Sequence, residues 1–120
     1  MMKSIQGLPD GVVGIQASGR VTGEDYELVL QPEIERALQH HPKVRLLYQL
    51  DPEFTGFTVG ALVDDAKVGL GHRKDIEKCA VVTDAKWIDE AIHVFRVMFP
   101  CPVKVFPNER LAEAKVWIAD

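Results

Sequence analysis

The chain has 120 residues, 47% of them apolar and 27% charged, which suits one domain with its own core and leaves no room for separate cofactor and substrate domains. Its formal net charge of −4 argues against general nucleic-acid binding, which needs surplus Lys and Arg to displace counterions from phosphates. No apolar signal core follows Lys3, and no run of about 18 uncharged apolar residues occurs. We therefore expect a cytoplasmic protein that is neither secreted nor membrane-spanning.

The first third of the sequence predicts a hairpin followed by a helix. The apolar-leaning runs Ser4–Leu8 and Val12–Ser18 are separated by a Pro-Asp-Gly turn sequence at residues 9–11. Thr22 is placed to cap a helix, with Asp25 three residues later as in a capping box. We therefore expect two antiparallel strands and then a helix that begins after Thr22.

Apolar spacing predicts that this helix lies against a sheet. The residues expected on its apolar face are Tyr26, Leu30, Ile34, Ala37 and Leu38. Pro32 lies within the same stretch, and proline lacks the N–H that an α-helix needs. We expect the helix to kink or restart there.

The rest of the sequence alternates between strands and helices. The predicted strands are Val44–Leu50, Cys79–Val82 and Val103–Phe106, and the predicted helices are Val59–Leu70, Ala85–Phe99 with Asp84 as N-cap, and Glu109–Ile118 with Leu111, Ala114 and Ile118 inward. The order is β-β-α-β-α-β-α-β-α. It predicts a single α/β domain over residues 1–120, with a five-stranded, mostly parallel sheet and an antiparallel N-terminal edge strand. In such sheets ligands bind beyond the carboxyl ends of the strands, here after Leu50 and Thr83.

No catalytic or metal-binding motif is present. The four His residues include no i, i+4 pair, there is no GxSxG sequence, and Gly69-Leu70-Gly71 ends a predicted helix instead of following a strand. Asp64 and Asp65 are adjacent, so on a helix they point about 100° apart and cannot share a pocket. Cys79 and Cys101 lack CxxC spacing and fit reduced, buried core thiols. We expect no metal, no cofactor and no enzyme activity.

The predicted third helix carries more apolar residues than packing on one side requires. They cover an arc of roughly 160°, against the ~100° stripe of a one-sided helix, and include Trp87, Phe95 and Phe99. Packing on a neighbouring helix, a homodimer or a cleft for an apolar ligand would each cover that arc. The loop after Asp51 adds Phe54 and Phe57 in a segment expected to be exposed, although loop aromatics often fold inward.

A basic cluster follows the second predicted helix. Its members are His72, Arg73, Lys74 and Lys78, with Lys67 nearby. An apolar helix followed by cations suits a bilayer interface with anionic headgroups, so Lys67, His72, Arg73 and Lys74 are candidate headgroup contacts at the inner face of a membrane. The alternative is a solvated surface cluster, because Asp75 and Glu77 are interspersed.

Several strings in this order resemble the SpoIIAA-like family, whose fold is shared with STAS domains and, more distantly, with SEC14/CRAL-TRIO domains. The strings are Tyr26 with Pro32, LLYQLDPEFTGFTVGALVDDAK at 46–67, CAVVTDAKW at 79–87, PVKVFP at 102–107 and EAKVWI at 113–118. They span nearly the whole chain. None of them is a catalytic motif.

The resemblance implies two kinds of role. STAS proteins that antagonise anti-sigma factors carry an Asp followed directly by a phosphorylatable Ser; here Asp51 matches the Asp, but Pro52 follows it, and the nearest hydroxyls, Thr55 and Thr58, become the candidate phosphosites. The SEC14-type likeness implies an apolar ligand or a membrane role, with the helix after the third strand as a movable cover. The positions carried into that role are Phe54, Phe57, Val59, Leu62, Val63 and Leu70.

The leading hypothesis is a noncatalytic module that binds a small hydrophobic or lipid-like ligand between the second and third helices, with Trp87, Phe95 and Phe99 as its floor. The alternative is a STAS-type protein-interaction module, without the usual phosphoserine, that uses the same loop and helix. An enzyme is the third possibility, since fold alone does not exclude chemistry.

Overall fold

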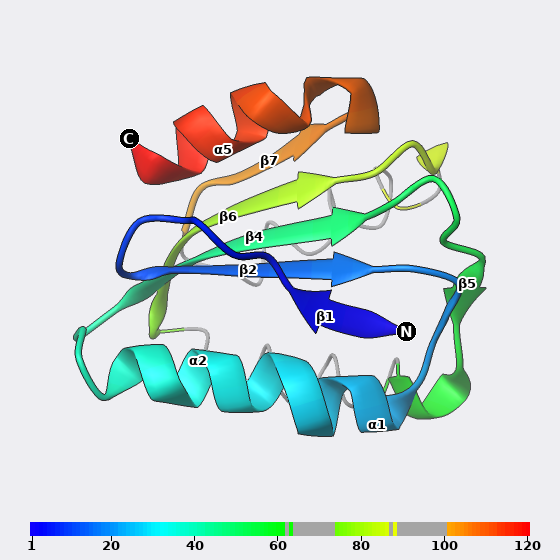
Figure 1. Ribbon diagram of the computed structural model, residues 1–120, viewed down its shortest axis with the longest axis horizontal. Helices are drawn as coiled ribbons and strands as arrows, with labels where there is room; N and C mark the ends of the chain where they lie inside the picture. The colour runs from blue at the N-terminus through cyan, green and yellow to red at the C-terminus, as the bar shows by residue number, and fades with distance from the viewer. Residues whose placement is uncertain (62, 64–73, 87, 89–100) are drawn as a thin grey trace.

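The structure is a computed structural model that describes residues 1–61, 63, 74–86, 88 and 101–120 (Figure 1). The elements in chain order are β1 (Met2–Ser4), β2 (Val12–Ala17), β3 (Arg20–Val21), α1 (Gly23–Asp25), the π-helical turn η1 (Tyr26–Leu30), α2 (Gln31–Leu38), β4 (Val44–Leu50), β5 (Gly56–Phe57), β6 (Ile76–Val82), β7 (Val103–Phe106), the 3₁₀ turn η2 (Asn108–Arg110) and α5 (Leu111–Ala119). In addition, residues 59–61, 63, 86 and 88 are helical. The rest of the predicted second and third helices lies outside the described residues.

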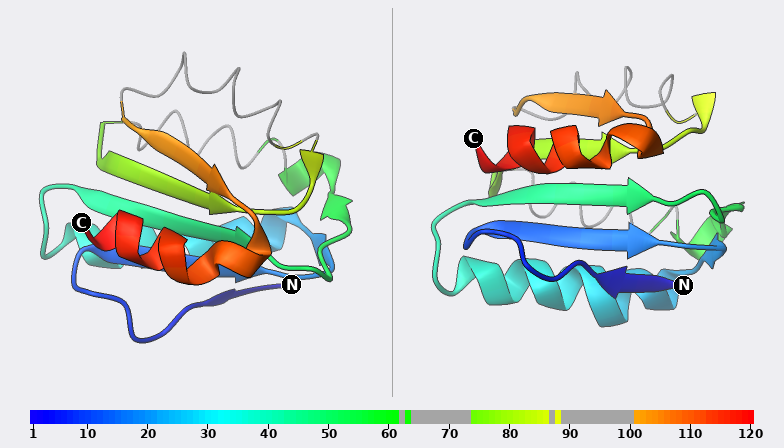
Figure 2. Two further views of the ribbon diagram at one scale, coloured as in Figure 1. Left: turned by 90° about the horizontal axis from the view of Figure 1, so that it is seen from above. Right: turned by 45° about the horizontal axis from the view of Figure 1, so that its top comes forward.

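The predicted sheet is confirmed. Five strands lie in the order β1-β2-β4-β6-β7; β1 pairs antiparallel with β2, and the other neighbours are parallel. Figure 2 shows α5 and α2 on opposite sides of this sheet. The carboxyl ends of the four parallel strands β2, β4, β6 and β7 therefore share one edge of the sheet, which we name the carboxyl edge.

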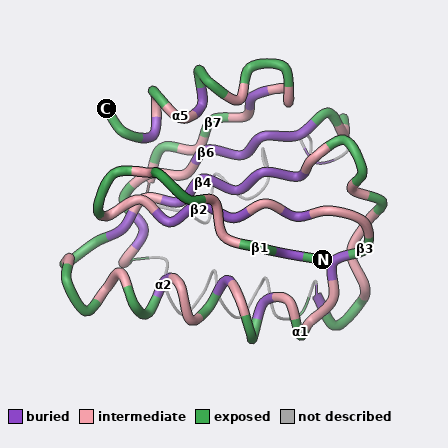
Figure 3. The backbone as a smooth tube through the Cα atoms, viewed as in Figure 1, coloured by how far each residue is buried: buried purple, intermediate pink, exposed green. Residues whose placement is uncertain are grey.

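Alternating side chains give the sheet a core on each face. On β4, Leu46, Tyr48 and Leu50 join the core that includes the buried residues of η1 and α2, whereas Leu47 joins the core under α5. The central strands are buried along most of their length (Figure 3). This explains why residues 44–50 form a nearly continuous apolar run.

The first strand differs from its predicted position. It covers Met2–Ser4, not Ser4–Leu8, and after it the chain crosses over Gly14 of β2. A Cβ at Gly14 would lie 2.3 Å from Cδ1 of Leu8 and 3.0 Å from Cβ of Ile5, so only glycine leaves room for this crossing. Ile5 and Leu8 consequently pack against the core under α5 and do not continue a flat strand.

The first helix runs from Gly23 to Leu38, and Pro32 does not break it. The Thr22–Asp25 capping box is present as predicted. A π turn, η1, precedes Pro32, and the N–H of Gln31 bonds to the carbonyl of Tyr26, five residues back. The expected kink or restart is thus replaced by a wide turn.

The π turn also explains which side chains are buried. Tyr26, Leu30 and Ile34 are all buried, at intervals of four residues. In a regular α-helix, Tyr26 and Ile34 would be rotated apart by about 80°, and one extra residue in a wide turn reduces this to about 20°. All three side chains can therefore face the same core.

A second sheet of two strands, β3 and β5, was not predicted. Arg20 and Val21 pair in parallel with Gly56 and Phe57. The backbone N–H of Thr55 bonds to the carbonyl of Gly19, and that of Thr58 to Val21. These bonds fix the segment that leads into the second helix against the start of the first.

Two further element starts differ from the sequence predictions. β6 begins at Ile76, three residues before the predicted Cys79, because Ile76 is buried opposite Val44 although Glu77 and Lys78 follow it. The last helix begins at Leu111 after the 3₁₀ turn η2. Ala114 and Ile118 are buried and Leu111 packs against the same core, as predicted.

Two cations from the sheet bind the last carbonyls of α5. Arg45 of β4 donates to the carbonyl of Ile118 at 2.9 Å and to Glu77 at 2.9 Å. Lys78 of β6 donates to the carbonyl of Trp117, and its ammonium lies 4.2 Å from the centre of that indole ring. Positive charge at a helix C-terminus is favourable, so these residues anchor α5 to the sheet.

Candidate functional site

Polar side chains meet where the parallel strands end. Gln16 of β2 donates to Asp51 at 3.0 Å, and Gln49 of β4 donates to Asn108 at 3.0 Å. The side chain of Asn108 donates to the carbonyl of Leu50 at 2.9 Å and to Asp84 at 3.0 Å. One asparagine thus joins the ends of β4, β6 and β7.

Asp84 takes part in this network, whereas the sequence predicted it as a helix N-cap. Its two carboxylate oxygens accept hydrogen bonds from the backbone and the side chain of Asn108, each at 3.0 Å. Thr83, one residue earlier, accepts a bond from the N–H of Ala85 at 3.1 Å. The network ties strand ends together and satisfies its own polar groups.

A depression of about 890 Å³ lies at the same edge, between β1, β2 and the loop after β4. Polar residues that line it include Lys3, Gln16, Ser18, Gln49, Asp51 and Glu53. Asp51 and Glu53 already accept hydrogen bonds from Gln16 and Ser18. Such a polar, open surface is a poor match for an apolar ligand.

Phe54 and Phe57, expected in an exposed loop, pack against the core. Both are half-buried, and their rings meet edge to face with centroids 5.0 Å apart. The β3–β5 pairing explains this, because it turns Phe57 toward the core beside Val21. Their role as ligand contacts stays a prediction.

Thr58 and Thr55, the two candidate phosphosites, have different surroundings. Thr58 caps the second helix, because its hydroxyl oxygen accepts the N–H of Ala61 at 3.0 Å. Thr55 is exposed, and its backbone N–H bonds to the carbonyl of Gly19. Modification of either residue stays a prediction.

The start of the second helix presents apolar side chains to solvent. Val59 is 80% exposed and Val63 48% exposed. Val63 and Gly60 line a depression of about 650 Å³ together with Thr22, Gly23, Glu24 and Glu27; we name this the acidic depression. Two exposed carboxylates therefore lie beside exposed valines.

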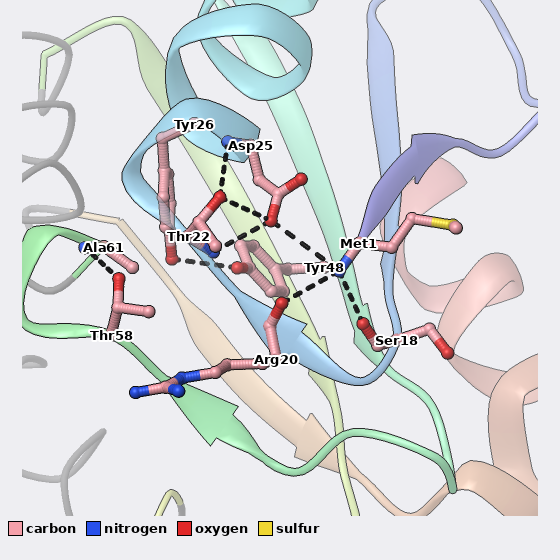
Figure 4. Close-up of polar contacts among 9 residues, drawn as sticks. All are labelled: Met1, Ser18, Arg20, Thr22, Asp25, Tyr26, Tyr48, Thr58 and Ala61. Atoms are coloured by element: carbon pink, nitrogen blue, oxygen red, sulfur yellow. Dashed lines mark hydrogen bonds and ion pairs between the residues drawn. The ribbon is translucent and has the colours of Figure 1, made fainter.

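The base of this region is held by a dense set of hydrogen bonds (Figure 4). The buried hydroxyls of Tyr26 and Tyr48 lie 2.9 Å apart and link the first helix to β4. Asp25 accepts the backbone N–H of Thr22 at 2.8 Å, and the amino group of Met1 donates to the carbonyls of Ser18 and Arg20. The acidic depression is thus built on rigid elements.

Many of the predicted site residues lie outside the described residues. These are Leu62, Leu70, Trp87, Phe95 and Phe99 of the predicted ligand site, and Lys67, His72 and Arg73 of the predicted headgroup site. Lys74 is exposed in a turn before β6. Lys78, grouped with it in the sequence, instead binds Trp117 at the end of α5.

The sequence also gave no indication of several residues in these two sites. Asn108 and Gln49 come together across 59 positions, and nothing in the sequence places Glu24 and Glu27 beside Val63. One usable signal was the pair of polar Gln residues near the ends of two apolar strands. No comparable signal marked the pairing of Tyr26 with Tyr48.

The two cysteines are half-buried, where the sequence predicted buried thiols. Burial raises the pKa of the Cys101 thiol above its ordinary value, and a backbone hydrogen bond partly offsets this. Within the described part of the chain, no three His, Cys, Asp or Glu side chains lie close enough together to hold a metal ion. None of the helices described there is long and apolar enough to cross a bilayer.

Comparison with known proteins gives the class of this fold. The family model described as SpoIIAA-like matches residues 12–119, and the chain belongs to that family. A solved structure similar to this one is an uncharacterized protein of the DUF3478 family with a SpoIIAA-like fold from Shewanella loihica PV-4. The two share 28% identity over 98% of this chain and 92% of the other, with a TM-score of 0.76. No curated protein matches the sequence.

Proposed function

We propose that this protein is a noncatalytic interaction module that binds a partner protein at the acidic depression and at Val59 beside it. The SpoIIAA-like fold itself points to a regulatory or interaction module. The observation that carries the proposal is the exposure of Val59 and Val63 at the first turn of a helix, beside Glu24 and Glu27. Exposed apolar side chains with a polar rim are typical of protein-binding surfaces.

The position of this surface supports the same role. It is built from the start of the first helix and the start of the second, which β3 and β5 hold together. Because the hydroxyl of Thr58 caps the second helix, the backbone around Val59 is held by a hydrogen bond within the protein itself. A preformed surface loses less conformational entropy on binding.

Variants of the two valines test the proposal. The double variant Val59→Ser/Val63→Ser should lose capture of a partner from cells of the source organism, and should bind the same partner, once identified and purified, at least about tenfold more weakly. Val116→Ser is a matched control, because Val116 is 70% exposed on α5, away from this surface. Equal loss in both variants, or in neither, would refute the assignment.

The hydrophobic-ligand hypothesis stays a prediction, as does contact with a membrane. Native mass spectrometry and lipid extraction of the purified protein test it separately from partner capture. A bound lipid that survives the Val59→Ser/Val63→Ser change would locate that ligand elsewhere. In that case, partner affinity alone would test the docking surface.

A further inference from the structure

The two carboxylates of the acidic depression have no partner among the residues that the structure describes. Glu24 and Glu27 are both exposed, and neither forms an ion pair or a side-chain hydrogen bond among the described residues. Asp25, which lies between them in the sequence, by contrast accepts hydrogen bonds from the backbone N–H and the hydroxyl of Thr22. Two exposed carboxylates without a partner among the described residues therefore lie at this surface.

The π turn adds an apolar side chain beside these carboxylates. Leu28 follows Glu27 in η1 and is 72% exposed, which makes it one of the most exposed large apolar residues described. Tyr26 and Leu30, two positions before and after it, are buried, whereas Leu28 is displayed outward. Single π turns of this kind are frequent at functional sites.

We infer that the partner segment that docks here is basic and amphipathic, with apolar side chains against Leu28, Val59 and Val63 and Lys or Arg side chains paired with Glu24 and Glu27. This inference rests on the proposed function and names the chemistry of its partner. Opposite charges around an apolar centre steer association and fix the register of a complex. An acidic partner or an anionic bilayer would instead be repelled by the same carboxylates.

The test uses a defined probe. A synthetic 14-residue helical peptide of leucines and lysines is titrated into ¹⁵N-labelled protein, with a leucine–glutamate peptide of the same pattern as its counterpart. The lysine peptide should shift the amide resonances of Gly23, Glu24, Glu27, Leu28, Val59 and Gly60. The glutamate peptide should not. Shifts confined to other surfaces, or equal binding of both peptides, would overturn the inference.

Charge reversal supplies the matched variants. Glu24→Lys/Glu27→Lys should weaken binding of the lysine peptide by about tenfold or more, whereas Glu109→Lys/Glu113→Lys, which reverses two exposed glutamates at the other end of the chain, should change it by less than about twofold. Circular dichroism and thermal unfolding check that both variants fold. Equal weakening by both pairs would show that only net charge matters, and the inference would fail.

Two further outcomes separate this inference from the proposed function. If the lysine peptide does not bind but Val59→Ser/Val63→Ser still abolishes binding of the natural partner, the partner chemistry is wrong and the docking surface stands. Binding to vesicles that contain phosphatidylserine, lost in Val59→Ser/Val63→Ser, would replace a basic protein segment by a membrane and contradict the inference.

Discussion

Asn108 shows how one side chain can hold the end of a parallel sheet. It donates to the carbonyl of Leu50 and to Asp84, and it accepts from Gln49, which is itself buried. Each partner would lack a bond if Asn108 were apolar, and a buried polar group without a bond costs about 1–3 kcal/mol. Asn108 is therefore the residue on which the carboxyl edge most depends.

We predict that Asn108→Ala lowers the free energy of unfolding by about 2–3 kcal/mol, because Gln49 and the carbonyl of Leu50 lose their partner. Urea unfolding followed by circular dichroism measures this. Gln31→Ala, at an exposed helical position whose side chain donates to Glu35, is the control and should cost less than about 0.5 kcal/mol. A loss of similar size in both variants would contradict the role of Asn108.

Cys101 offers a second prediction, through its pKa. Burial raises the pKa of this thiol, so less thiolate is present at a given pH than in an ordinary thiol. In a Cys79→Ser background, Cys101 should react with iodoacetamide more slowly than glutathione does at the same pH. Because the folded protein favours the protonated thiol, its contribution to stability should be lost as the pH rises through the folded-state pKa. Faster alkylation than glutathione would contradict this account.

Local patterns in the sequence were sufficient where the interacting residues are neighbours in the chain. The Thr22–Asp25 capping box was predicted because both residues lie within one helical turn. The hydrogen bonds of Asn108 and of the Tyr26–Tyr48 pair were not predicted, because each joins residues that come together only in the folded sheet. Glu24 and Glu27 were visible in the sequence, but nothing there placed Val63 beside them.

At the scale of elements, β4 and β7 have their predicted bounds, since short apolar runs with prolines close to both ends mark strands clearly. β3 and β5 were missed because two-residue strands carry no periodicity. The π turn was missed as well, because intervals of four residues between Tyr26, Leu30 and Ile34 also fit the apolar stripe of a regular α-helix. The wide turn only narrows the angle between these side chains.

The π turn leads to a prediction about helix geometry. Deleting Leu28 in a Pro32→Ala background should yield a regular α-helix that keeps Tyr26, Leu30 and Ile34 on one face, because the extra residue and the proline are both removed. The free energy of unfolding should stay within about 1 kcal/mol of the Pro32→Ala protein. Thermal and urea unfolding measure this.

Deleting Glu35 in the same background is the control. It removes a residue from the α-helical part, α2, so it rotates one half of the helix by about 100° and takes Ile34 and its neighbours out of register, which should cost about 3 kcal/mol or more. Equal costs for the two deletions would show that the wide turn does not hold a surplus residue.

At the scale of the whole molecule, a mostly parallel five-stranded sheet with a core on each face places two different surfaces close together. The carboxyl edge carries polar groups that bond to one another, whereas the acidic depression combines Val63 of the second helix with two exposed carboxylates of the first that have no partner in the described part of the chain. The loop from Asp51 to Thr58 connects the two surfaces. Its start lines the depression at the carboxyl edge, and its last residue, Thr58, caps the second helix. The fold class could be predicted from the alternation of strands and helices in the sequence, but the presence of two distinct surfaces could not.

Hydrogen exchange of the complex with the identified partner tests the central claim most directly. The account predicts that amides in residues 22–28 and 58–63 become protected on binding, while those of α5 exchange at the rate seen in the free protein. Protection confined to α5 or to the edge strand β7, with residues 22–28 and 58–63 unchanged, would contradict it.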